Sequence, residues 1–187
     1  MRVIAGSVRG MKLAAPRGMQ TRPTADRVRE ALFSIVSSRR DLQEAQVLDI
    51  CAGTGSLGIE ALSRGAAFCC FVEHDRHVQA VLEKNLEATG LAFRSQVLTF
   101  DCLKALRLLA SQGRRFDVAF FDPPYASALY DTVPEAVGGL SLLADDGVLI
   151  VECAARKPLP ERVGTLIKCD RRVYGDTALE FFMLEDA

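Results

Sequence analysis

The chain has 187 residues, of which 49% are hydrophobic and 25% charged, and its formal net charge is −1. This size and composition are typical of one soluble globular domain and exclude two full-sized domains. No apolar run approaches the length of a membrane span, and the N-terminus has no apolar stretch typical of a signal peptide. We therefore expect a cytoplasmic protein that does not bind membranes.

Charge is distributed unevenly along the chain. Residues 1–40 contain nine Lys/Arg and two Asp/Glu, a net charge of +7, whereas the remaining residues carry a net charge of −8. A basic segment on an acidic body suggests a polyanionic partner that the basic segment contacts. A solvated basic surface would explain the charge alone equally well.

The first 45 residues are expected to form an arm and a helix. In residues 1–23, Gly6 and Gly10 punctuate a turn between two extended stretches, which predicts a short basic hairpin arm. Residues 24–45 are predicted to be a helix and a linker, because apolar residues recur at helical spacing within residues 25–38.

Residues 46–187 are expected to form the core of the same domain, which would then span residues 1–187. Apolar runs predict strands at 47–51, 68–73, 96–100, 117–121 and 148–152, with helices between them, the last of these helices near 130–142. Such alternation predicts an α/β fold with a mostly parallel sheet and helices on both faces. Two more strands, 165–173 and 178–184, flank Gly175-Asp176 and predict an antiparallel C-terminal hairpin, giving seven strands in all.

The six cysteines lie mostly inside these apolar runs and form no C-x-x-C pair. We therefore expect reduced thiols in the core, with no bound metal.

Acidic residues and a glycine loop fall at the carboxyl ends of the predicted strands, where ligands of open parallel sheets bind. Asp49 ends the first strand and is followed by the loop Gly53–Gly58, whose glycines allow the backbone to approach a ligand closely. Glu73 ends the second strand and can accept both hydroxyls of a ribose, and Asp101 follows the third and can accept from an adenine amine. The predicted cofactor site also includes their neighbours Thr54, Gly55, His74 and Cys102.

This pattern describes a pocket for an adenosine with a charged tail. The glycine motif alone would also fit a nicotinamide dehydrogenase. Asp49, four residues before the first glycine, is better placed to hold a cationic amino-acid tail than a pyrophosphate, and no chain remains for a separate substrate domain. Both features favour S-adenosylmethionine as the cofactor.

The fourth strand ends in Asp122-Pro123-Pro124-Tyr125, the most specific motif of the sequence. The exocyclic amine of a base is a poor nucleophile because its lone pair is delocalised into the ring. A carboxylate and a backbone carbonyl that accept its two N–H groups would localise that lone pair. The prolines fix the loop, and Tyr125 can stack on a base that has been taken out of its stack. These four residues are the predicted catalytic site; a structural Pro-Pro turn is the alternative.

The D-P-P-Y motif, together with the glycine loop, resembles class I, Rossmann-like methyltransferases that act on amino groups. Segments 1–13, 22–33, 47–61 and 174–177 narrow the resemblance to the RsmD family. Cys51 departs from the Phe or Tyr expected before Ala52-Gly53. The resemblance implies methylation of the N2 amine of a guanine in 16S ribosomal RNA, with S-adenosylhomocysteine as the product and without a metal.

The resemblance further implies that the arm contacts RNA, through Arg9, Lys12, Arg22 and Arg27. The partner would be 16S ribosomal RNA, within a small ribosomal subunit or its assembly intermediate, and the enzyme is expected to be a monomer. Two alternatives remain. A DNA adenine-N6 or cytosine-N4 methyltransferase shares the motif but usually has an added recognition region. A non-catalytic RNA-binding or ribosome-assembly module could retain the fold.

Overall fold

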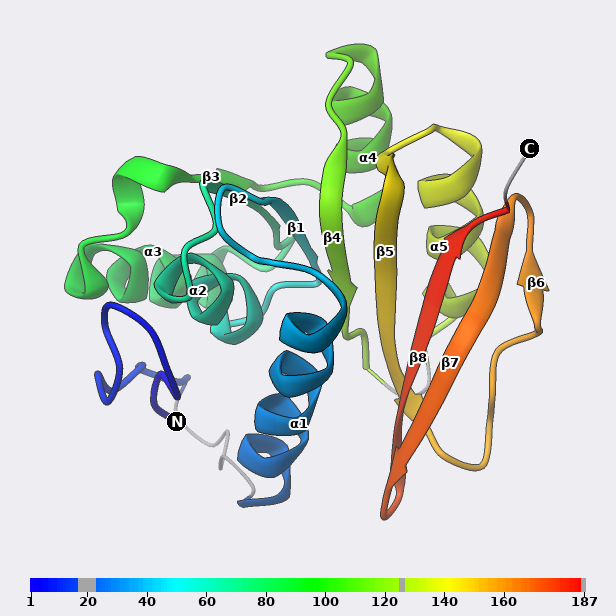
Figure 1. Cartoon of the computed structure of the whole chain (residues 1–187). Coiled ribbons are helices and arrows are strands. Elements are labelled where there is room, and N and C mark those ends of the chain that lie inside the picture. The colour runs from blue at the N-terminus through cyan, green and yellow to red at the C-terminus, as the bar shows by residue number, and fades with distance from the viewer. Residues whose placement is uncertain (17–22, 125–126, 186–187) are drawn as a thin grey trace.

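The computed structural model describes residues 1–16, 23–124 and 127–185, arranged around an eight-stranded sheet of order β3-β2-β1-β4-β5-β8-β7-β6 (Figure 1). The strands are β1 (Gln46–Ile50), β2 (Phe68–Val72), β3 (Ser95–Leu98), β4 (Phe116–Phe121), β5 (Leu143–Ala154), β6 (Arg162–Val163), β7 (Leu166–Tyr174) and β8 (Thr177–Leu184). The helices are α1 (Pro23–Arg39), α2 (Ser56–Ser63), α3 (Arg76–Thr89), α4 (Cys102–Ser111) and α5 (Leu129–Gly139), with a short 3-10 helix η1 (Ala92–Arg94).

Strands β1 to β5 pair in parallel, and β5, β8, β7 and β6 continue the sheet in antiparallel pairing. The predicted α/β fold with a mostly parallel sheet and an antiparallel C-terminal hairpin is therefore confirmed. The prediction of seven strands is wrong by one, because the two-residue strand β6 pairs with β7.

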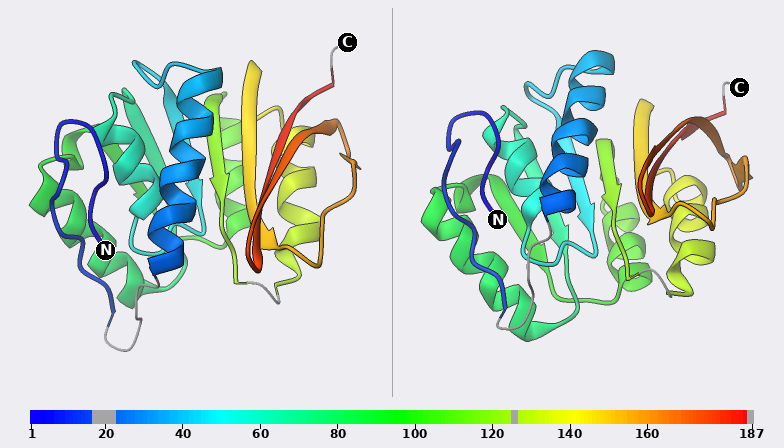
Figure 2. Two further views of the ribbon diagram at one scale, coloured as in Figure 1. Left: turned by 60° about the horizontal axis from the view of Figure 1, so that its bottom comes forward. Right: turned by 90° about the horizontal axis from the view of Figure 1, so that it is seen from below.

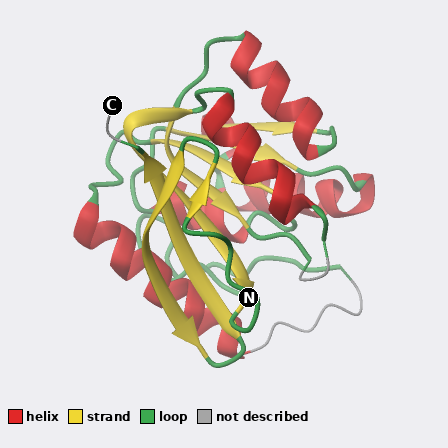
Figure 3. Ribbon diagram, turned by 90° about the vertical axis from the view of Figure 1, so that its right-hand side faces the viewer, coloured by secondary structure: helices red, strands yellow, loops and turns green. Residues whose placement is uncertain are grey.

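Helices cover both faces of the sheet (Figures 2 and 3). Successive side chains of a strand point to opposite faces, and β1 shows the result. Val47 packs in a core cluster with side chains of α1, α2 and α3, while its neighbour Leu48 packs in a second cluster with side chains of α4 and α5. Both residues are fully buried. Burial on both faces is what a near-continuous apolar strand predicts.

The N-terminal arm is a short hairpin held by an isolated bridge between Arg2 and Lys12, as the sequence predicts. It does not extend into solvent but packs on α2, with Val3 and Leu13 buried. The carboxylate of Glu60, itself only 1% exposed, accepts the backbone N–H groups of residues 4 and 5 at 2.7 and 3.0 Å. A buried carboxylate thus anchors the arm to the core.

Two element boundaries and the burial of one cysteine differ from what the sequence predicts. Helix α5 ends at Gly139, three residues before the expected end, and β5 begins at Leu143. The cysteines are all free, but Cys169 is exposed and not part of the core. In the described part of the chain, no helix is both long and apolar enough to span a membrane.

Candidate functional site

Four acidic residues lie at the carboxyl ends of neighbouring parallel strands. Asp49 is the penultimate residue of β1, and Glu73, Asp101 and Asp122 follow β2, β3 and β4. Because β3, β2, β1 and β4 are adjacent and parallel, these residues share one edge of the sheet. This edge is at the bottom of Figure 1, toward which the arrowhead of β4 points. The structure therefore brings together the residues that the sequence singles out.

The loop between β1 and α2 needs its glycines for conformation and for close packing. Gly53 and Gly55 have φ angles of 56° and 83°, in the left-handed region that favours glycine. A Cβ at Gly55 would come within 2.3 Å of Leu82 Cδ1, and one at Gly58 within 2.3 Å of an edge carbon of Phe71. The loop thus lies directly against α3 and β2, and its shape is fixed by packing.

Asp49 is buried beneath this loop, with 1% of its surface exposed. Its Oδ2 accepts the backbone N–H of Gly58 at 2.9 Å, which ties the end of β1 to α2. Burial raises the pKa of Asp49 to about 7; the hydrogen bond from Gly58 opposes this shift, and the nearby Glu73 carboxylate adds to it. A cationic group at this edge would favour the ionised form of Asp49.

Glu73 is also buried, and both of its carboxylate oxygens accept backbone hydrogen bonds. Gly53 N donates to Oε2 at 3.0 Å, and Asp75 N donates to Oε1 at 2.8 Å. The exposed imidazole of His74 lies 3.4 Å from Oε1 through Nδ1. The carboxylate therefore links the glycine loop to the start of α3 and keeps lone pairs for further donors.

Asp101 and Cys102 begin α4. The exposed Asp101 caps the helix by accepting the N–H of Lys104 at 3.0 Å through Oδ1. Cys102 is buried, and its sulfur lies 3.3 Å from the sulfur of Cys51, which follows β1. The proximity of these two thiols, 51 positions apart in sequence, was not predicted.

Asp122 is enclosed by protein on several sides, yet its side chain is open to solvent. The surrounding protein atoms raise its pKa well above the ordinary value, and the carboxylates of Glu152 and Asp49 raise it further. Sequence reasoning overlooked Glu152. Its position near the carboxyl end of the fifth predicted strand was the signal that could have identified it.

The proline loop packs against α5. Pro123 is buried, and its carbonyl oxygen lies 3.4 Å from the hydroxyl of Tyr130, which donates at 2.9 Å to the carbonyl of Glu152. Pro124 is exposed. Tyr125, predicted to stack on the base, lies outside the described residues.

Comparison with known proteins places the chain in a family. Residues 1–183 match the model of the family described as Conserved hypothetical protein 95. The Escherichia coli protein named ribosomal RNA small subunit methyltransferase D is 36% identical over 185 residues, covering 99% of this chain and 90% of its own length.

The chain belongs to the RsmD family of methyltransferases.

Solved structures agree with this assignment. YhhF from Escherichia coli aligns with a TM-score of 0.84 at 36% identity, over 100% of this chain and 99% of that one. SMU.776, solved in complex with S-adenosylhomocysteine, aligns with a TM-score of 0.68 over 87% of this chain and 50% of that one. At 15% identity this second likeness shows a shared fold only.

In this member of the RsmD family, the described residues that are predicted to contact RNA lie on two elements, the hairpin arm and α1. Arg9 and Lys12 are exposed on the hairpin arm, and Arg27 is exposed on the second turn of α1. Arg22 lies outside the described residues. Helix α1 begins near the edge that carries the acidic residues and ends at the opposite edge (Figure 2).

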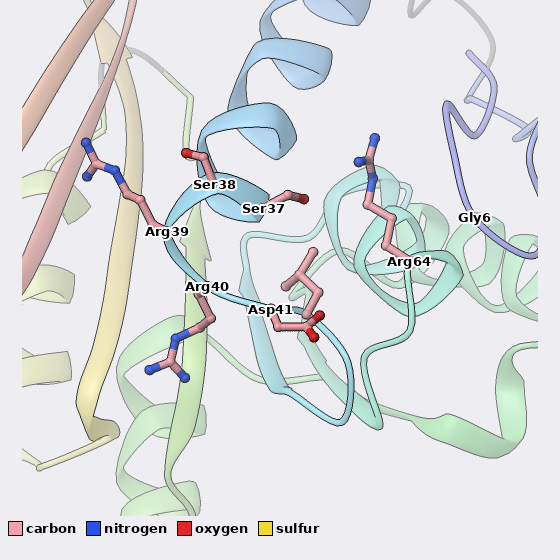
Figure 4. A pocket seen from close by; sticks show the side chains of 8 residues that line it. Gly6, Ser37, Ser38, Arg39, Arg40, Asp41 and Arg64 are labelled. Atoms are coloured by element: carbon pink, nitrogen blue, oxygen red, sulfur yellow. The ribbon is translucent and has the colours of Figure 1, made fainter.

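The described residues of this RsmD-family protein also line an open cavity of about 640 Å³, but on the other edge of the sheet (Figure 4). It lies where α1 ends and α2 ends, next to the starts of β1 and β2. Its arginines are all ion-paired: Arg39 with Asp170, Arg40 with Asp117 and Asp146, and Arg64 with Glu60. None of the predicted site residues lines this cavity. We therefore do not assign the reactive site to it, although it is large enough to hold a ligand.

The sequence alone suggests that the pairs Arg114-Arg115 and Arg171-Arg172 are solvated turn residues, but one arginine of each pair packs against the protein. Arg171 lies within β7, where it bonds the buried Glu180 at 2.9 Å and the carbonyl of Ala155. Arg114 places its guanidinium over the rings of Phe68 and Phe116.

In the described ranges, no three His, Cys, Asp or Glu side chains form a group that could hold a metal ion.

Proposed function

We propose that the protein transfers a methyl group from S-adenosylmethionine to the N2 amine of a guanine in 16S ribosomal RNA. The observation that carries this proposal is the row of carboxylates Asp49, Glu73, Asp101 and Asp122 along one edge of the parallel sheet. The relative named ribosomal RNA small subunit methyltransferase D supports the choice of RNA.

The first three carboxylates of this row suit the three parts of the cofactor. Glu73 would accept the ribose hydroxyls, and Asp101 would accept the adenine amine with the oxygen that does not cap α4. Asp49, whose pKa is raised by burial, would be stabilised as a carboxylate by the cationic amino-acid tail. Gly53, Thr54 and Gly55 would let the backbone approach the tail, with His74 and Cys102 at the border of the site.

S-adenosylmethionine supplies a methyl group on a sulfonium, which is open to direct in-line displacement. The protein has to hold the guanine amine along that line and to localise its lone pair. Asp122 and the carbonyls of the proline loop are suited to accept its two N–H groups, because the prolines have fixed φ angles. Asp122 need not be a strong base, because the amine can lose its proton after the methyl group has arrived.

The proposed partner is 16S ribosomal RNA, in the cytoplasm, within a small subunit or its assembly intermediate, with a monomeric enzyme. Arg9, Lys12, Arg22 and Arg27 would contact phosphates around the guanine. Since the arm is short and packed on α2, the particle would supply much of the specificity.

Asp122→Ala tests the assignment of the catalytic loop. Removing one preorganised hydrogen-bonding partner at the reacting amine should lower the rate of methyl transfer by about 10²–10³-fold. Affinity for the cofactor should change much less, and Asp145→Ala, an exposed carboxylate on β5, is the matched control. The measurement is single-turnover transfer of labelled methyl groups to small-subunit particles. A near-normal rate in the Asp122→Ala variant would refute the role of Asp122. If the wild type transferred methyl groups to duplex DNA alone, the DNA methyltransferase would be favoured. If the wild type transferred none, the non-catalytic assembly module would be favoured.

A further inference from the structure

Two thiols from distant segments meet at the proposed cofactor edge. Cys51 follows β1 and adopts the left-handed conformation, with a φ of 61°, and Cys102 is the first residue of α4. Their sulfur atoms are 3.3 Å apart. A disulfide has its sulfurs about 2.05 Å apart, so closing the remaining gap needs a shift of only about 1.2 Å.

Their neighbours in sequence connect this pair to the cofactor site. Cys51 is followed by Ala52-Gly53 of the glycine loop, and Cys102 directly follows Asp101. The carboxylate of Glu73 is close enough to raise the pKa of both thiols. Cys51 is partly exposed, so a small oxidant can reach the pair from solvent, while Cys102 is 6% exposed.

We propose that Cys51 and Cys102 are a site of reversible oxidation, at which a hydroperoxide forms a disulfide that disables the cofactor site. The bond itself follows from the geometry of the two thiols. Its consequence for activity rests on the function proposed above.

The chemistry uses one hydroperoxide for each disulfide. The Cys102 thiolate attacks the peroxide oxygen, the O–O bond breaks, and the sulfur becomes a sulfenic acid while the leaving oxygen takes a proton. The sulfur of Cys51 then attacks the sulfenic sulfur, its proton leaves with the hydroxyl as water, and the S–S bond forms. Two thiols are oxidised, and the peroxide is reduced to an alcohol, or to water if it is hydrogen peroxide.

The structure favours Cys102 as the attacking sulfur. The thiol of Cys51 can donate to the sulfur of Cys102, and this hydrogen bond lowers the pKa of Cys102, although burial and the nearby carboxylates oppose the shift. The position of Cys102 at the N-terminus of α4 adds the positive end of the helix dipole. The same hydrogen bond raises the pKa of Cys51, so Cys51 keeps its proton while Cys102 is the thiolate.

Closing the bond should move the two segments that hold Gly53 and Asp101. A displacement of about 1 Å in a positioning group can lower a rate about a hundredfold. We therefore expect methyl transfer to fall by about a hundredfold in the oxidised protein, and to return after reduction with dithiothreitol.

The test uses the full chain carrying Cys169→Ser, which removes the exposed thiol. The protein is treated with hydrogen peroxide, its remaining thiols are blocked with N-ethylmaleimide, and its peptides are mapped without reduction. We expect one linked pair, Cys51 with Cys102. It should be absent after the further change Cys51→Ser and retained after Cys153→Ala, which alters a buried thiol outside the pair.

Cofactor affinity and methyl transfer are measured for each protein before and after oxidation, and each oxidised protein is compared with its own reduced form. The proposal is supported if oxidation lowers both cofactor affinity and methyl transfer in the Cys169→Ser protein and in the protein that also carries Cys153→Ala. Neither quantity should fall on oxidation in the protein that also carries Cys51→Ser. Failure to form the linked pair overturns it, and so does a linked protein that binds and transfers normally. If the reduced wild type itself binds no S-adenosylmethionine, the proposed function fails, whereas the mapping still decides whether the bond forms.

Discussion

Asn85 of α3 joins the basic arm to the glycine loop, and its removal is the sharpest test of how the two are connected. Its side chain is 2% exposed. Oδ1 accepts the N–H of Ala14 at 2.8 Å, and Nδ2 donates to the carbonyls of Ala14 and Thr54 at 3.1 and 3.0 Å. One amide therefore holds both segments.

Asn85→Ala removes all three hydrogen bonds. Two of them hold the arm through Ala14, so at about 1 kcal/mol for each the free energy that holds the arm in place should fall by about 2 kcal/mol. Because every 1.4 kcal/mol corresponds to about a tenfold change in an equilibrium constant, the arm should open about thirtyfold more often. The global unfolding free energy should fall by less, since the arm can detach without opening the sheet.

Amide hydrogen exchange measures this opening directly. The amides of Val3 and Leu13, which bond to the carbonyls of Met11 and Met1, should exchange about thirtyfold faster in the variant. The amides of β1 should keep their protection. The matched control is Gln79→Ala on the same helix, which removes hydrogen bonds with Glu83 and Thr99 but none with the arm. Unchanged exchange at Val3 and Leu13 in Asn85→Ala would refute the reasoning, as would equal acceleration in the control.

Three further outcomes follow from the site and the arm. Glu73→Ala should weaken S-adenosylmethionine binding by about 1.5–3 kcal/mol in calorimetry, because a charged acceptor is removed, and an unchanged dissociation constant would exclude the ribose role. Since the pKa of Asp49 is raised to about 7, its carboxylate is protonated as the pH falls below this value, so affinity for the cationic cofactor should fall with it. Asp49→Asn should show a flatter dependence in the same titrations, and a wild-type profile in this variant would assign the titration to another group. Replacing Arg22 and Arg27 with alanine should weaken binding to the ribosomal substrate, with cofactor affinity close to normal. The slope of log affinity against log salt should flatten by somewhat less than one unit for each phosphate that the variant no longer neutralises. An unaltered salt slope would favour the alternative interpretation, in which the basic N-terminal residues are only a solvated surface.

The layout of the sheet could be predicted because its signals are local. A run such as Val47–Ile50, apolar but for one acid, can only be a strand buried on both faces, and the glycines that follow it require a turn. The carboxyl ends of such strands meet at one edge, so the grouping of Asp49, Glu73 and Asp101 followed from the order of the elements.

What sequence reasoning missed depends on contacts between distant segments. Strand β6 exists only because residues 162–163 pair with β7, and two residues carry no periodic signal. Helix α5 was extended too far because Leu140, Leu142 and Leu143 continue an apolar pattern past the glycines that end it. The contact of Cys51 with Cys102 and the bonds of Asn85 to the arm depend on side-chain positions that periodicity does not specify.

The docking of the arm also sets an order of events during synthesis of the chain. The arm is made before the residues that hold it: Ile4 and Glu60 are 56 positions apart, and Ala14 and Asn85 are 71 apart. A nascent chain folds from contacts that have already emerged, so the arm cannot complete its docking until both α2 and α3 have left the ribosome. The basic residues of the arm therefore remain undocked while β1 and α2 are being made, and the hairpin completes its docking only when α3 has folded beside α2.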